Sequence, residues 1–338
     1  MQKTAFHRSK FEVILASIAV LLLLFTDQTL VFSSAPAKHN YAFDFNGVNY
    51  AAFGDFIQKN GAEFSYNLLK DNFKNNDFLA HNYAHVVGLS VFEQKGSEGM
   101  KICDAAFNYG CFHGFIEGIL RKDGVGAMSG IEKACFDLGS INAASCLHGI
   151  GHGVMAISYD LPKALETCDS LGDFSREWCW DGVFMERNVG SMQLQSDRFV
   201  LTGNNLMKPC EDLDLKYQDK CWRNQTYAWY SFFGGDVKKV ASQCSLISQQ
   251  FYQTCVRNLG MQTVAIYGSA QKSVDLCSRI VKTNFRDLCF LGTLDELMFE
   301  GRDVQNAASI CDFVSTKDEC TEEYVQQESN YRERFAKK

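Results

Sequence analysis

Five of the seven histidines lie between residues 81 and 152, and none follows in the rest of the chain. Two pairs have the spacing i, i+4, which places side chains on one face of a helix: His81 with His85 in HNYAH, and His148 with His152 in HGIGH. Imidazole groups gathered on one face are ligands for transition metals such as zinc, iron and copper. The pattern predicts a metal site, with a hydrogen-bonded packing seam and a metal-free catalytic histidine as alternatives.

The cysteines give these residues a common register. His113 and His148 each follow a cysteine by two positions, and Glu117 and His152 each follow one by six. At about 100° per helical residue, these positions lie about 200° and 240° from the cysteine. The stripe is therefore predicted to face away from the cysteine and to line a surface or groove. Since packed helices stand about 8–10 Å apart, side chains on neighbouring repeats can meet at one ion or at two.

Two further segments extend the stripe. HNYAH has no cysteine nearby, but Leu79 takes its place in the same register. CWDGVFME offers Asp181, which we predict as a ligand in preference to Glu186 because position seven points to the cysteine side. The predicted metal ligands are His81, His85, His113, Glu117, His148, His152 and Asp181.

Later repeats carry different residues at the same positions, namely Arg223 with Tyr227 and Arg257 with Met261. Arginine recognises carboxylate and phosphate groups, so Arg223, Tyr227 and Arg257 are predicted to bind a substrate, although a solvated helical face explains them equally well. A surplus of residues falls within 187–205. That insertion is predicted to be either a lid or a neutral surface loop.

Fourteen cysteines form seven pairs, and the first members recur every 32 to 42 residues, a period typical of two-helix repeats. The separation within a pair is 8 to 12 residues, and the spacing between pairs is less regular. Zinc sites with close C-x2-4-C spacing are the competing interpretation, but no such close pair occurs. We therefore predict the disulfides Cys103–Cys111, Cys135–Cys146, Cys168–Cys179, Cys210–Cys221, Cys244–Cys255, Cys277–Cys289 and Cys311–Cys320.

Each repeat reads as a helix, a polar turn and a second helix that opens with C-x-x-G, where glycine permits close helix packing. The sequence predicts an all-α solenoid of about eight antiparallel helical hairpins, seven of them stapled. The segment YGCFHGFIEGILRKDGVGAMSGIEKACFDLG resembles the secreted cysteine-rich helical-hairpin proteins related to tetratricopeptide repeats. This resemblance covers about residues 60–325 and implies the same architecture, although the eleven-residue cysteine spacing is longer than in that family.

The N-terminus has the order of an export signal. Lys3, Arg8 and Lys10 precede the apolar run Val13–Phe25, so residues 1–37 are predicted to be a signal peptide or a membrane anchor. The repeat domain is predicted at 38–325 and a polar tail, or a capping helix, at 326–338. Positive residues before the apolar run place the rest of the chain outside, where disulfides form.

Composition narrows the function classes. The formal net charge of -7 excludes a nucleic-acid partner, since phosphate backbones require a basic surface. The fingerprints of nucleotide binding and of serine or HExxH hydrolases are missing from the sequence. Two interpretations stay open: an extracytoplasmic metalloprotein, with or without enzymatic activity, and a non-catalytic scaffold that binds a protein or peptide.

Overall fold

Short and long helices alternate along the computed structural model, which describes residues 43–47, 49–73, 78–138, 140–190, 201–299 and 303–335. Two helices come first, α2 (Tyr50–Asn60) and α3 (Ala62–Asn72). The long helices are α4 (Phe78–Lys95), α5 (Gly110–Asp123), α7 (Ser140–Ser158), α9 (Asp173–Met185), α11 (Leu215–Phe232), α13 (Gln249–Tyr267), α15 (Thr283–Met298) and α17 (Lys317–Phe335). The short ones are α6 (Met128–Asp137), α8 (Leu161–Cys168), α12 (Val237–Cys244), α14 (Ala270–Cys277) and α16 (Val304–Ala307). No strand occurs among the described residues, which confirms the predicted all-α class.

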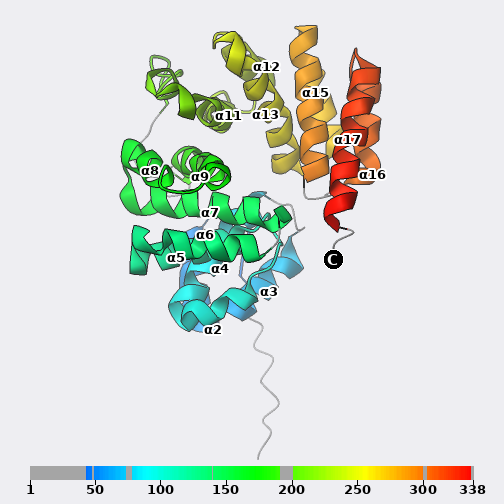
Figure 1. Cartoon of the computed structure of the whole chain (residues 1–338). Helices are drawn as coiled ribbons and strands as arrows, with labels where there is room; N and C mark the ends of the chain where they lie inside the picture. Colours follow the sequence, from blue (N-terminus) through cyan, green and yellow to red (C-terminus); the bar gives the residue numbers. More distant parts are fainter. Residues whose placement is uncertain are drawn as a thin grey trace, which may run out of the picture. The chain divides into compact units, whose positions relative to one another are not determined.

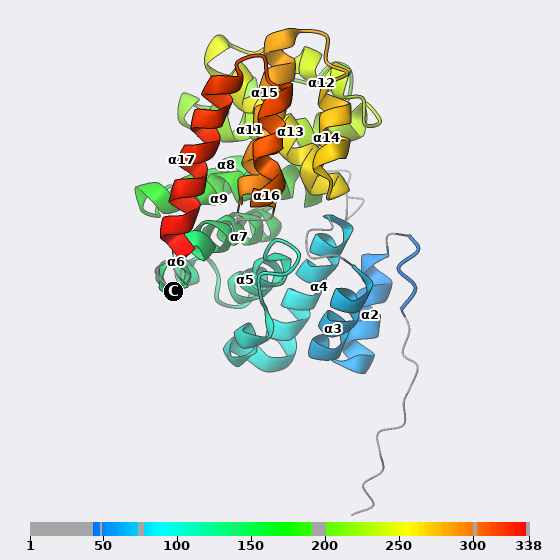
Figure 2. The ribbon, with the colours of Figure 1, turned by 90° about the vertical axis from the view of Figure 1, so that its right-hand side faces the viewer.

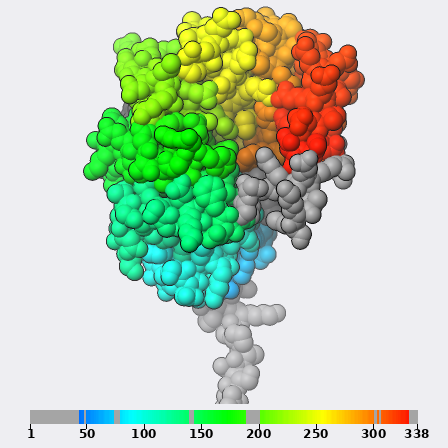
Figure 3. Space-filling view, in the orientation of Figure 1, coloured from blue at the N-terminus to red at the C-terminus, as the bar shows by residue number. Residues whose placement is uncertain are grey.

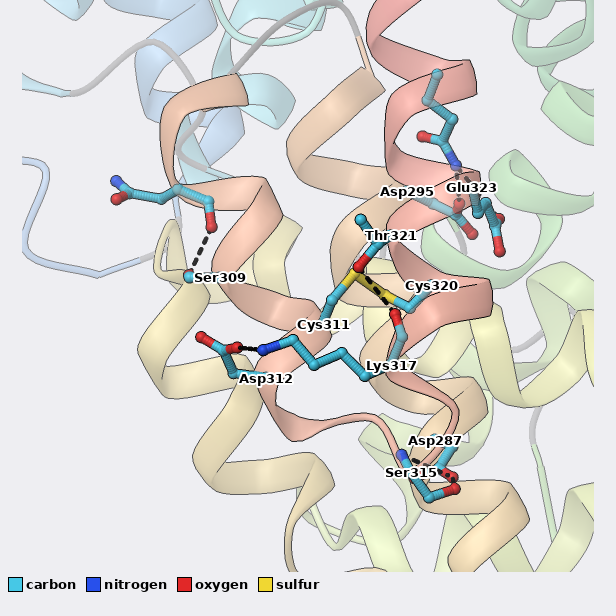
Figure 4. The surroundings of a disulfide bond; sticks show 12 residues. Asp287, Asp295, Ser309, Cys311, Asp312, Ser315, Lys317, Cys320, Thr321 and Glu323 are labelled. Carbon is cyan, nitrogen blue, oxygen red and sulfur yellow. Dashed lines mark hydrogen bonds and ion pairs between the residues drawn. A yellow bond between two sulfur atoms is a disulfide. The ribbon is translucent and has the colours of Figure 1, made fainter.

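Each of the seven disulfides joins the two arms of one hairpin, with Cα–Cα distances of 5.3 to 5.8 Å. The predicted pairing is confirmed. In α6, α8, α12 and α14 the first cysteine lies in the last turn, whereas the other three lie in or beside 3-10 helices. Figure 4 shows the last bridge, Cys311–Cys320, with the ion pair between Lys317 and Asp312 spanning the same turn.

The long helices pack on one another in chain order: α4 on α5, α5 on α7, α7 on α9, and onward to α15 (Figure 1). α2 and α3 both pack on α4 (Figure 2). In the space-filling view, successive segments from α5 to α13 accordingly appear as adjacent bands (Figure 3). Equivalent positions on neighbouring long helices therefore face one another. The superhelical course of a solenoid stays a prediction.

Glycines set how closely the long helices approach. A Cβ atom added at Gly114 of α5 would lie 1.9 Å from the carbonyl oxygen of His85, and one at Gly88 of α4 would lie 1.9 Å from that of Cys111. The helices α7 and α9 make the same reciprocal contact through Gly151 and Gly182, at 2.0 Å each. Backbones touch at both crossings, so these glycines bring α4 close to α5 and α7 close to α9, as the C-x-x-G pattern predicted.

Replacing Gly114 by alanine is expected to lower the free energy of unfolding by about 1–3 kcal/mol or more, because the methyl group forces α4 and α5 apart. Gly130→Ala is the matched control. Gly130 lies exposed in α6 with nothing within 4 Å of a new Cβ, so alanine there is expected to stabilise the helix by about 0.5–1 kcal/mol. Chemical denaturation of both oxidised variants measures the difference; equal stability would contradict the packing role.

The predictions for the N-terminal segment, the insertion and the C-terminal segment have different outcomes. The predicted signal or anchor lies outside the described residues, and so does most of the predicted lid, whose residues 187–190 form a π-helical turn. Within the described residues, no helix combines the length and apolar character that a membrane crossing requires. Helix α17 continues to Phe335, so residues 326–335 are helical, as in the capping-helix alternative.

Candidate metal centre

The five clustered histidines come from three neighbouring long helices, α4, α5 and α7. Ring centroids of adjacent pairs lie 4.7 to 5.5 Å apart. Four of the rings are buried and His85 is partly exposed. The stripe therefore lies between helices rather than on an open surface, because the glycine contacts draw these helices together.

The first group consists of His81, His85 and His113, whose ligand atoms lie within 4.8 Å of one another. The Nε2 atom of His85 is 3.1 Å from Nε2 of His81 and 3.3 Å from Nδ1 of His113. Nitrogens around a tetrahedral zinc ion are separated by about 3.3 Å, given Zn–N distances of about 2.0–2.1 Å. The spacing of these three nitrogens suits a single ion.

Backbone carbonyls fix the orientation of two of these rings. The Nδ1 atom of His81 is 2.7 Å from the carbonyl oxygen of Phe107, and Nε2 of His113 is 3.1 Å from that of Ser145. A carbonyl oxygen only accepts, so each ring donates its proton outward. The lone pairs of the opposite nitrogens then point toward His85. Metal-binding histidines are oriented in this way by outer partners.

The three rings of the first group have few N–H protons to share with one another. A neutral imidazole carries one proton, and His81 and His113 have already donated theirs to carbonyl groups. His85 can carry a proton on Nε2. It can donate that proton either to Nε2 of His81 or to Nδ1 of His113. The three nitrogens thus converge at hydrogen-bonding distances, an arrangement that could also hold a cation.

The loop that supplies the carbonyl of Phe107 has an unusual backbone. Phe107, Asn108 and Tyr109 all have positive φ angles, between 54° and 62°. Non-glycine residues rarely adopt this left-handed conformation, and each such residue costs about 1 kcal/mol or more. Strain of this kind is concentrated at functional sites, and here it aims a carbonyl oxygen at His81.

The second group consists of His85, His152 and Glu186, again with ligand atoms within 4.8 Å. Nδ1 of His152 is 2.8 Å from Oε2 of Glu186. The prediction that Glu186 points to the cysteine side is wrong. α9 ends at Met185, and Glu186 begins the π-helical turn 186–190, so the rotation of 100° per residue no longer applies.

Asp181 was predicted to be a ligand, but it belongs to neither group. Its Oδ2 atom accepts from Nδ1 of His148 at 3.0 Å, and its Oδ1 atom accepts from the side-chain amide of Asn224 at 2.8 Å. Burial alone would raise the pKa of Asp181, but the charge of Arg223 and the bond from His148 hold it well below its usual range. Asp181 therefore orients His148, whose Nε2 faces Nε2 of His152 at 2.9 Å.

The second half of the cluster can satisfy its own hydrogen bonds. Burial raises the pKa of Glu186 to about 7, so a protonated Glu186 can donate to Nδ1 of His152. His152 then donates from Nε2 to His148, and His148 donates from Nδ1 to Asp181. Every proton in this chain has an acceptor. The two halves therefore differ in how their rings can share protons.

Glu117 is also outside both groups. It accepts from Nε and Nη2 of Arg121 at 2.8 and 2.6 Å. Burial and the neighbouring Glu186 raise the pKa of its carboxyl group. The ion pair with Arg121 therefore occupies this carboxylate.

Three of the histidines are held in the neutral form. Burial lowers the pKa values of His85, His113 and His152 well below the usual value, and repulsion from the other histidines lowers them further. Neutral imidazole is the form that binds metals. Since all fourteen cysteines are in disulfides, thiolate is excluded as a ligand.

A cavity of about 110 Å³ adjoins the cluster. Its lining includes His81, His113 and His148 on one side, and Arg223 and Tyr227 of α11 on the other. Two of the three predicted substrate-binding residues thus reach the same cavity as the histidines.

Arg257, the third predicted substrate-binding residue, is not among the residues that line the cavity. It donates to Asp295 at 2.8 and 2.9 Å and also pairs with Glu323 (both labelled in Figure 4). Two carboxylates therefore engage its guanidinium group, and the structure does not bring it to the candidate site.

Comparison with protein families, with characterised proteins and with solved structures found no match to this chain. The site must therefore be interpreted from its own geometry.

Proposed function

We propose that this chain is an extracytoplasmic metalloprotein whose first metal ion is bound by His81, His85 and His113. The observation that carries the proposal is the convergence of three ring nitrogens, two of them on rings that carbonyl groups hold in place. A divalent cation would accept all three lone pairs at once. Seven disulfides suit the oxidising compartment in which such a protein would act.

A second position is supported by the group of His85, His152 and Glu186. His85 belongs to both groups. A neutral imidazole has a single lone pair for a metal, so His85 would serve both ions at once only by giving up its ring proton and bridging them as imidazolate. Because carbonyl groups hold two of the three ligand rings at the first position, that position is proposed to bind more tightly. Asp181 would act by orienting His148, and outer partners of this kind affect metal affinity by about 10–100-fold.

Three nitrogen ligands are one fewer than zinc takes in closed structural sites. The ligand set would leave an open coordination position. Imidazole and carboxylate ligands suit zinc, iron or copper alike. The geometry favours a site that handles a small molecule over one that only stabilises the fold. The N-terminal segment is proposed to anchor the chain to a membrane.

The direct test is elemental analysis of the oxidised chain, purified without chelators and without a histidine tag. We expect at least one equivalent of zinc, iron or copper to remain after extensive dialysis. Retention of none of these metals, together with no uptake when they are added, would overturn the proposal. It would favour a scaffold that binds a protein or peptide.

A further inference from the structure

The cavity beside the histidine cluster lies away from the proposed metal position. His85, which belongs to both ligand groups, is not among the residues that line it. Ser145 does line it, and the carbonyl group of Ser145 accepts from Nε2 of His113, the nitrogen opposite the one that faces His85. The cavity therefore meets His113 on its carbonyl-bonded side, so a ligand in the cavity would be recognised by other residues.

Arg223 of α11 lines this cavity, and few strong acceptors meet its forked end. Its Nε atom lies 3.3 Å from Oδ1 of Asn258 and 3.7 Å from Oδ1 of Asp181. Its Nη2 atom lies 3.9 Å from the sulfur of Met261, and thioether sulfur is a weak acceptor. A guanidinium group has five N–H donors. The two terminal nitrogens therefore keep donors for an oxygen atom that enters the cavity.

Asn108 is a second lining residue with unused hydrogen-bonding groups. Its side chain makes no hydrogen bond to any residue that the structure describes. Its backbone has a positive φ angle of 54°, in the loop that precedes α5. Asparagine adopts this conformation more readily than most residues, and backbone strain is concentrated at ligand-binding sites. The amide of Asn108 therefore offers the cavity both an N–H donor and a carbonyl acceptor.

The charges around the cavity favour a neutral ligand. Arg223 lies beside the carboxylate of Asp181, so these two charges offset each other. The charge of Glu296, which also lines the cavity, acts on Arg223 as well. An anion would add a further negative charge next to these carboxylates. A neutral carbonyl oxygen accepts from Arg223 without this repulsion.

The size and the apolar part of the lining limit the ligand further. Trp178, Met185, Ala265 and Phe299 contribute apolar surface. The volume of about 110 Å³ is smaller than an apolar cavity of about 150 Å³ that admits benzene, so about five or six non-hydrogen atoms fit. A molecule that fills so small a space contacts the whole lining. It can therefore meet Arg223, Asn108 and the apolar side chains together.

We infer that this cavity binds a small neutral amide, whose carbonyl oxygen accepts from Arg223 and whose N–H group donates to the side-chain oxygen of Asn108. A short alkyl part of the ligand packs against Trp178 and Met185. A ketone of the same size lacks the donor for Asn108, and a carboxylate lacks that donor and adds a charge. The inference does not depend on the proposed metal site, because neither Arg223 nor Asn108 is a proposed metal ligand.

Three molecules of similar size and shape test this inference in a nuclear magnetic resonance titration of the oxidised full chain: butyramide, methyl propyl ketone and butyrate. We expect butyramide to bind saturably. The ketone should bind about 10-fold more weakly, because it lacks one hydrogen bond, and butyrate at least as weakly as the ketone. This comparison uses the wild-type chain, so it decides the question even where a variant does not fold.

Three variants test the individual contacts. Arg223→Gln should weaken butyramide binding by about 10-fold or more, since a charged hydrogen bond is lost. Asn108→Gly removes the amide while glycine keeps the positive φ angle without strain. It should weaken butyramide binding by about 10-fold and leave the ketone unaffected. Ala265→Leu should abolish binding of all three molecules, because the larger side chain fills the cavity.

Arg257→Gln is the matched control for Arg223→Gln and should leave butyramide affinity unchanged, since Arg257 does not line the cavity. Butyrate binding as tight as butyramide binding, or no binding of butyramide to the wild-type chain, would overturn the inference. So would butyramide binding that neither Arg223→Gln nor Asn108→Gly weakens. None of these results bears on the proposed metal site, which elemental analysis tests separately.

Discussion

Replacing His85 by alanine is expected to remove the metal from both proposed positions. His85 supplies a ligand atom to each group, so its loss leaves His81 and His113 alone at the first position and His152 with Glu186 at the second. Two ligands without the third bind an ion far more weakly. We expect the apparent affinity to fall by more than about 100-fold, beyond the 10–100-fold effect of outer partners. The metal content after dialysis measures this fall in apparent metal affinity.

His152→Ala is the matched comparison. It also removes one imidazole from the cluster, but it leaves the nitrogens of His81, His85 and His113 in place. We expect this variant to retain the first ion and to lose only the second. Glu93→Ala, an exposed position on the same helix α4 as His85, controls for helix stability and should retain wild-type metal.

Helix content and the seven disulfides should be unchanged in all three variants, because the bridges lie outside the histidine cluster. Metal retention by His85→Ala equal to wild type would contradict the assignment of His85 as the shared ligand. Equal loss in His85→Ala and His152→Ala would contradict the separation into two positions.

Much of this architecture could be predicted from spacing alone. The cysteine period gave the helical hairpins and the disulfide pairs, because both depend on local, repeated geometry. The register from cysteine to histidine placed His113 and His148 on facing helices, since a straight α-helix rotates by a constant angle. The close approach of those helices was predicted from the C-x-x-G pattern, whose glycines leave room for backbone contact.

The wrong or missed predictions concern a helix end, a contact with another helix and a loop backbone group. Glu186 was misplaced because α9 ends one residue earlier, and nothing in the sequence marks the π-helical turn that follows. Asp181 faces the cluster as predicted, but the sequence does not reveal that Asn224, on another helix, turns it toward His148. The carbonyl of Phe107 is a backbone group in a strained loop, so no residue type identifies it.

Reduction of the seven disulfides is expected to unfold the chain and to release the proposed metal ions. Each bridge closes a short loop of 8 to 12 residues, and the loops do not overlap along the chain. In the chain-entropy model a loop of this length contributes about 3 kcal/mol, so seven independent loops contribute about 20 kcal/mol. Whole domains are stable by only about 5–15 kcal/mol. The reduced chain therefore lacks the stability to fold.

The bridge Cys135–Cys146 provides the single-site version of this experiment, because it fixes α6 to the helix that carries His148 and His152. Replacing both cysteines by serine should lower the free energy of unfolding by about 3 kcal/mol. Loss of the last bridge, Cys311–Cys320, should cost a similar amount but spare the metal, because η6 (Ala308–Phe313) and α17 carry no proposed ligand. Chemical denaturation followed by circular dichroism, together with elemental analysis, measures both effects in the oxidised variants. For the fully reduced chain, the reductant is a phosphine, which has no thiol to bind the metal. A fully reduced chain that keeps its helices and unfolds cooperatively would show that helix packing alone suffices.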